Sequence, residues 1–287
     1  MAEPVPDTSP DAHETAFEAF GVRIGVSTND SRVRPRLTDL VPPHSRPCDP
    51  REVEQHYSVN TADGMTFTVR YDLRDGVPGQ PWDAASYVAT DVDRELALGL
   101  LDSHVHGCVA LNAPGHIFIG AGAVAHHSRA ILLPGPALSG KTTLVSALVD
   151  AGCVYYSDQY AVLDERGLAH PYARPLSPAA QAQPETNHRG DIRSALVGAE
   201  PLPVGAVVAT SYRPGAEWRP RPLSRGEAVL ALLSHAVPAQ HRTEDVMHAI
   251  NRALEQNPLM LASDRGEAEP MAAQLLAELE REPTGRL

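Results

Sequence analysis

The feature that most constrains the fold is the glycine-rich segment GPALSGKT at residues 135–142, which satisfies the pattern G-x-x-x-x-G-K-[ST]. An apolar run at 130–133 precedes it and predicts a strand. After it, Leu144 and Leu148 recur at the spacing of one helical face. A strand, a glycine-rich loop and a helix in this order bind phosphate groups in many α/β proteins. The segment therefore predicts an α/β fold with a nucleotide site.

Each residue type in this segment suits contact with a triphosphate. The glycines allow backbone N–H groups to point at phosphate oxygens, and the start of the helix favours negative charge. Lys141 is expected to reach the β and γ phosphates, while Thr142 offers a hydroxyl to Mg²⁺. The predicted cofactor-binding residues are Gly135, Pro136, Ala137, Leu138, Ser139, Gly140, Lys141, Thr142 and Thr143.

An acidic partner for the metal or for an attacking hydroxyl is expected near this loop. Asp158 stands at the carboxyl end of the next apolar run, CVYYS, from which a strand would deliver its carboxylate. We therefore predict Thr142 and Asp158 as metal ligands and Asp158 as a catalytic group. The alternative is a simple turn residue, the role that we assign to Asp164 in the turn 164–167.

Phosphoryl transfer also benefits from a planar cation that stabilises developing charge. Arg174, which follows the predicted strands, is our candidate, and Arg189 and Arg193 in the long polar loop beyond it are alternatives of equal standing. A basic stretch lies further along the chain and could contact an anionic acceptor or belong to an exposed loop; it contains Arg213, Arg219, Arg221 and Arg225.

Residues 132–177, LLPGPALSGKTTLVSALVDAGCVYYSDQYAVLDERGLAHPYARPLS, resemble the HPr kinase/phosphorylase-like family, in particular its related kinases of uncertain substrate. The resemblance covers about 117–174, with weaker similarity from Gly21 to the C-terminal segment. It implies an HPr kinase-like P-loop core and a phosphotransferase that uses ATP and Mg²⁺. It also places Asp158 at the position of the family's catalytic aspartate, with Lys141 and Arg174 as the other candidate catalytic residues, and suggests a homo-oligomer.

The chain departs from the founding enzymes of that family at two positions. Gln159 stands where they carry a second aspartate, and Gly120 stands where related sequences often carry a histidine. His116, His126 and His127 are possible substitutes for that histidine. We therefore predict transfer of the γ-phosphate to a hydroxyl of a peptide, natural product or small molecule. The alternative is a nucleotide-binding regulatory or assembly protein without phosphotransfer.

Composition limits the other functions. The formal net charge of −12 disfavours binding to nucleic acid and to anionic lipid. No run of 18 apolar residues suggests a membrane span, and three cysteines without CxxC spacing fit a reducing cytoplasm. The 13 histidines match no known zinc signature, although His104, His106, His126 and His127 form dense clusters. A serine hydrolase is not supported, since no G-x-S-x-G motif occurs.

The chain divides into three predicted parts. These are a disordered acidic tail at 1–16, an N-terminal α/β region at 17–115, and an HPr kinase-like P-loop catalytic domain at 116–287. In the stretch VDRELALGLLDSHVHGCVAL at 92–111, Leu96, Leu100 and Leu101 indicate an amphipathic helix. Ser224 has capping-box spacing to Glu227, which predicts a helix start, and further helices are expected to begin at Thr243 and Pro270.

Overall fold

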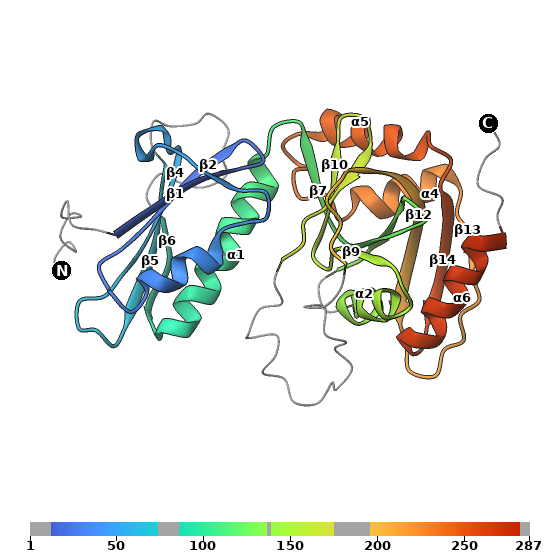
Figure 1. Ribbon diagram of the computed structural model, residues 1–287, viewed down its shortest axis with the longest axis horizontal. Coiled ribbons are helices and arrows are strands. Elements are labelled where there is room, and N and C mark those ends of the chain that lie inside the picture. Colours follow the sequence, from blue (N-terminus) through green and yellow to red (C-terminus); the bar gives the residue numbers. More distant parts are fainter. Residues whose placement is uncertain (1–12, 74–85, 137–138, 175–195, 282–287) are drawn as a thin grey trace. The chain divides into compact units, whose positions relative to one another are not determined.

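The computed structural model describes residues 13–73, 86–136, 139–174 and 196–281 (Figure 1). Its chain separates into two compact units, Met1–Pro114 and Gly115–Leu287. Each unit combines a β-sheet with helices, so the α/β class expected from the sequence is confirmed. Among the described residues, no helix is both long and apolar enough to cross a membrane.

The first unit is a six-stranded sheet with a long helix, α1 (Arg94–Asn112), packed on one face. The strand order is β3-β1-β2-β4-β5-β6, and only β2 and β4 pair in parallel. The elements are β1 (His13–Ala19), β2 (Val22–Thr28), β3 (Arg46–Pro47), β4 (Gln55–Asn60), β5 (Phe67–Leu73) and β6 (Ser86–Val92), with short 3₁₀ helices at Arg34–Leu40 and Pro50–Glu52.

Two sequence expectations for this unit need correction. The strand β1 begins at His13 and pairs along its length with β2, so residues 13–16 belong to the sheet rather than to a tail; residues 1–12 lie outside the described part. The helix α1 buries Leu101 and Val105 toward the sheet, whereas Leu96 is 50% exposed. Of the leucines that predicted the apolar face of α1, Leu101 is thus buried as expected, whereas Leu96 does not belong to that face.

The second unit is built on a sheet in the order β11-β10-β7-β8-β12-β14-β13, with β9 paired to β7. Strand β11 also pairs with β12, so part of the sheet closes on itself. The strands are β7 (His116–His126), β8 (Arg129–Pro134), β9 (Val154–Ser157), β10 (Tyr160–Asp164), β11 (Leu168–His170), β12 (Leu202–Tyr212), β13 (Arg221–Pro222) and β14 (Leu259–Arg265). Strands β8, β12 and β14 are parallel, so their carboxyl ends share one edge.

Helices cover both faces of this sheet (Figure 1). The pair α4 (Arg225–Leu233) and α5 (Thr243–Leu254) packs on one face, and α2 (Lys141–Asp150) and α6 (Ala268–Arg281) pack on the other. Strand β8 supplies both cores: Leu132 joins the first, while Ile131 and Leu133 join the second. This alternation explains why the strand before the glycine-rich segment reads as a continuous apolar run.

Local signals place several elements of this unit. The residues 126–129 form a hairpin connection between β7 and β8. Ser224 caps α4 in a reciprocal capping box with Glu227, and α5 begins at Thr243, as predicted. The helix α6 begins at Ala268, two residues earlier than the start predicted at Pro270.

Candidate functional site

The glycine-rich segment joins the carboxyl end of β8 to the first turn of α2. Gly140 precedes the helix with a φ of 83°, a left-handed conformation that side chains rarely adopt, and its carbonyl accepts the first helical hydrogen bond, from Leu144 N at 3.1 Å. At the other end of the segment, Gly135 N donates to Gly120 O of β7 at 3.3 Å. Ala137 and Leu138, two of the predicted binding residues, lie outside the described residues.

The ammonium group of Lys141 lies within this loop. Its Nζ donates to the carbonyls of Gly135 at 2.8 Å and Pro136 at 2.5 Å. Burial lowers the pKa of Lys141, while Asp158 acts in the opposite direction. The lysine is therefore already held at the loop backbone. The oxygens of a bound phosphate could accept hydrogen bonds from Nζ in place of these two carbonyls.

The structure brings the two predicted metal ligands together. Asp158 lies in the short connection between β9 and β10, and its Oδ2 accepts a hydrogen bond from Thr142 Oγ1 at 3.1 Å. Its other oxygen, Oδ1, accepts from the Tyr155 hydroxyl at 3.1 Å. Burial and the Asp158 charge raise the pKa of Tyr155, which therefore stays a neutral donor. Both carboxylate oxygens of Asp158 are thus held by hydrogen bonds, one from the first turn of α2 and one from β9.

Arg174 and Gln159 form a second polar contact beside Asp158. Arg174 Nη1 donates to Gln159 Oε1 at 2.5 Å, and Gln159 is the residue that directly follows Asp158. The predicted catalytic arginine therefore contacts the residue next to the predicted catalytic aspartate. Arg189 and Arg193, its alternatives, lie outside the described residues. Asp164 accepts hydrogen bonds from Arg166 N and Leu168 N, in accordance with its assigned turn role.

Arg265 is a buried residue of this site that the sequence analysis missed. It ends β14, is 2% exposed, and donates from Nη2 to Gly140 O at 2.8 Å and from Nη1 to Gly266 O at 2.9 Å. Burial lowers the pKa of its guanidinium. The arginine thus fixes the residue that precedes α2. The only sequence signal is a charged residue at the end of an apolar strand.

His235 is the second residue that the sequence analysis missed. It follows α4, and its carbonyl accepts a hydrogen bond from Gly120 N at 2.8 Å. Burial lowers the pKa of its imidazole and the nearby Lys141 lowers it further, so the ring is neutral at pH 7. Of the histidines considered as substitutes at position 120, His116 instead packs edge-on against His170, with ring centroids 5.1 Å apart.

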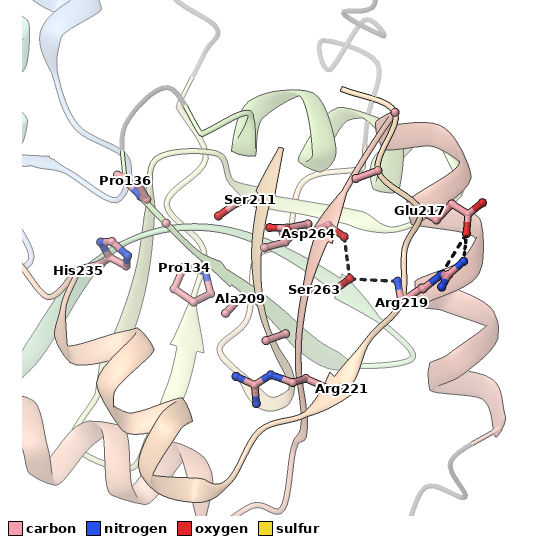
Figure 2. A pocket seen from close by; sticks show the side chains of 15 residues that line it. Pro134, Pro136, Ala209, Ser211, Glu217, Arg219, Arg221, His235, Ser263 and Asp264 are labelled. Atoms are coloured by element: carbon pink, nitrogen blue, oxygen red, sulfur yellow. Dashed lines mark hydrogen bonds and ion pairs between the residues drawn. The ribbon is translucent and has the colours of Figure 1, made fainter. Parts of the chain in front are cut away.

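A cavity of about 890 Å³ opens at the carboxyl ends of the parallel strands (Figure 2). This edge is where open α/β sheets bind ligands. Figure 2 shows His235 on the same side of the cavity as Pro134 and Pro136, with the ends of β12 and β14 beside them. The lining of the cavity includes Gly135, Pro136, Thr210, Arg219, Arg221 and His235.

The predicted basic stretch contributes to this cavity in part. Arg219 and Arg221 line it, but Arg219 pairs with Glu217 at 2.5 Å and Arg221 pairs with Glu227 at 2.8 Å. Arg213 similarly pairs with Asp264 at 3.2 Å. These ion pairs balance the positive charge, so the cavity is a polar region of mixed charge rather than a strongly basic one. The side chain of Thr210 adds a buried hydroxyl with no hydrogen-bond partner among the described residues.

A scan against protein-family models and a search of curated proteins both found no match for this chain.

Proposed function

We propose that this chain is an ATP- and Mg²⁺-dependent phosphotransferase with an HPr kinase-like P-loop core, which transfers the γ-phosphate of ATP to a hydroxyl group of a peptide, natural product or small molecule. The observation that carries the proposal is the 3.1 Å contact between Thr142 Oγ1 and Asp158 Oδ2 beside Lys141. A hydroxyl and a carboxylate are ligands that suit Mg²⁺, and the lysine is a cation suited to phosphate.

The loop residues fit a triphosphate. Ser139 Oγ is buried and has no hydrogen-bond partner among the described residues, and phosphate oxygens would accept a bond from it. Lys141 would exchange its bonds to the loop carbonyls for bonds to phosphate. Thr142 and Asp158 would hold Mg²⁺, which when bound supplies positive charge against the phosphate oxygens. The cavity beside Gly135 and Pro136 has the volume of a site for an organic ligand.

The proposed reaction assigns the proton transfer to Asp158. An acceptor hydroxyl placed at its carboxylate gives up its proton to Asp158 as the acceptor oxygen bonds to the γ-phosphorus. The bond from the γ-phosphorus to the bridging oxygen breaks, and ADP leaves with those electrons. Tyr155 holds the carboxylate in position, and Arg174, bonded to the neighbouring Gln159, is the proposed cation for the charge that develops on the transferring group. Positioning and charge neutralisation supply most of the acceleration.

One observation favours the alternative, a nucleotide-binding regulatory or assembly protein without phosphotransfer. Gln159 offers an amide, already bonded to Arg174, at the position next to Asp158, so one carboxylate alone serves this site among the residues that the structure describes. The two functions differ in whether bound ATP is turned over. Both functions require nucleotide binding, so the test must measure nucleotide binding and ATP turnover separately.

The test compares MgATP binding by calorimetry with ADP formation, using water and a panel of hydroxyl compounds and serine- or threonine-containing peptides as acceptors. Lys141→Ala should abolish turnover and weaken binding. Asp158→Asn should keep binding within a few-fold but lower turnover by about 10²–10⁴-fold, the usual contribution of a general base. The matched control is Asp164→Asn, another strand-end aspartate, which should leave turnover unchanged.

Equal turnover in Asp158→Asn and Asp164→Asn would remove Asp158 from the reaction. Binding of MgATP with no ADP formation for any acceptor would support the regulatory alternative. Wild-type turnover that survives Lys141→Ala with normal folding would exclude the glycine-rich loop as the reaction site.

A further inference from the structure

The β7–β8 hairpin places two adjacent histidines before the amino end of β8, whereas the glycine-rich loop follows the carboxyl end of that strand. His126 is the last residue of β7, and His127 and Ser128 form the two-residue turn with φ of 47° and 59°. Positive φ at both turn residues is the type I′ geometry, which histidine tolerates better than most residues. The His126 and His127 rings consequently lie edge to face, with centroids 4.0 Å apart.

A carboxylate from a distant part of the sequence completes this group. Glu280 lies near the end of α6, and the possible ligand atoms of His126, His127 and Glu280 all lie within 4.8 Å of one another. The position of α6 is fixed by its core contacts, since Leu275 and Leu276 pack with Val124 of β7. Two imidazoles and one carboxylate are therefore brought together by the fold rather than by local sequence.

The hairpin is held in place independently of these three residues. Arg129, which follows the turn residue Ser128, donates from Nη2 to Gln256 O at 2.9 Å and to Val204 O at 3.2 Å. The turn is thus anchored to β12 and to the end of α5 before any ion binds. A preorganised group of donors loses less conformational entropy on coordination.

One atom of the group has no partner in the protein. His126 Nε2 is buried and makes no hydrogen bond to any described residue. A buried polar nitrogen without a partner costs about 1–3 kcal/mol. A metal ion bound between the two histidines and Glu280 would accept the lone pair of this nitrogen and neutralise the carboxylate.

We propose that His126, His127 and Glu280 form a binding site for a divalent transition-metal ion of the zinc type. Imidazole nitrogens and a carboxylate oxygen are ordinary zinc ligands, and three protein ligands leave a fourth position for water. The mixed donor set favours zinc, copper or nickel over Mg²⁺, which prefers oxygen ligands. The site would connect the β7–β8 hairpin to α6 and is separate from the proposed phosphotransfer residues.

The test is titration of the metal-free full chain with ZnCl₂, without nucleotide, by calorimetry, together with thermal unfolding. We expect wild-type protein to bind Zn²⁺ and to unfold at a higher temperature when it is present, because ligand binding to the folded state stabilises it. His127→Asn keeps a residue that tolerates positive φ, and Glu280→Gln keeps size. Each should weaken Zn²⁺ binding at this site by about tenfold or more, a loss expected when a metal site is perturbed.

The matched controls are His248→Ala, an exposed histidine of α5, and Glu269→Gln, an exposed glutamate in the first turn of α6. Both should bind Zn²⁺ as the wild type does. The proposal is overturned if the wild type shows no Zn²⁺ binding, or if His127→Asn and Glu280→Gln, folded normally without metal, bind with wild-type affinity and stoichiometry. Neither result depends on ATP turnover.

Discussion

Replacing Gly140 with alanine tests how the fold holds the start of α2. Gly140 has a φ of 83°, and in this left-handed region an L residue costs about 1–2 kcal/mol. An added Cβ would also overlap the Arg265 guanidinium, which is 2% exposed and bonded to the Gly140 carbonyl. Overpacking of this kind typically costs a further 1–3 kcal/mol or so. Gly140→Ala should therefore lower the free energy of unfolding by about 2–5 kcal/mol.

Gly152, just beyond the other end of α2, provides the matched control. Its φ is 99°, yet an added Cβ would meet no atom within 4 Å. Gly152→Ala should thus show the backbone cost alone, about 1–2 kcal/mol. The difference between the two variants isolates the contact with Arg265.

Urea unfolding of the full chain, followed by circular dichroism, measures the change for each variant. When the protein also carries Arg265→Met, Gly140→Ala should still lower the free energy of unfolding more than Gly152→Ala, but by a smaller difference. The methionine side chain is shorter and flexible and can move aside for the added Cβ. Equal losses for the two glycine variants in the wild-type background would refute the argument that Arg265 fixes the residue before α2.

Three further outcomes are expected. Gln159→Asp adds a carboxylate next to Asp158, and mutual repulsion should shift the pH profile of ADP formation or its Mg²⁺ requirement; superimposable profiles would place Gln159 outside the reaction. Hydrogen bonds from Arg32 lower the pKa of Asp30 to about 2, so the stabilisation that it provides is complete above about pH 4 and is lost as pH falls toward 2. Wild type and Asp30→Asn should accordingly differ in urea midpoint at pH 6 and converge near pH 2. Ser224→Ala removes the α4 cap and should cost about 0.5–2 kcal/mol of unfolding free energy, measured in urea.

Elements with strong local signals were predictable from the sequence. The apolar run before Gly135 and the capping-box spacing at Ser224 correspond to β8 and α4, because neighbouring residues determine both features. The pairing of Thr142 with Asp158 was also expected, since a strand end beside the loop delivers the carboxylate there. The short strand β13 gave no such signal, because two residues are too few to show a period.

The contributions of Arg265 and His235 were not predictable in this way. Arg265 is separated from Gly140 by 125 positions, and only the parallel arrangement of β8, β12 and β14 brings them together. His235 is joined to β7 through a backbone hydrogen bond from Gly120, which no side-chain pattern reveals. Leu96 shows a second limit of the sequence. The leucine spacing correctly predicts a helix, but it does not determine which residues of α1 face the sheet, and Leu96 is exposed.

Strand β7 pairs with two successive strands along the same edge. Its first half pairs with β10, where Gly120 lies opposite Tyr160, and its second half pairs with β9, where Ala123 lies opposite Ser157. Asp158 lies in the chain between these pairings, and Gly135 is bonded to the same strand at Gly120. One continuous strand therefore sets the spacing between the lysine loop and the aspartate. Loops around the cavity can lengthen or change their side chains without altering that spacing, whereas a one-residue insertion between Gly120 and Ala123 would reverse the faces of the residues that follow and separate the two halves of the site.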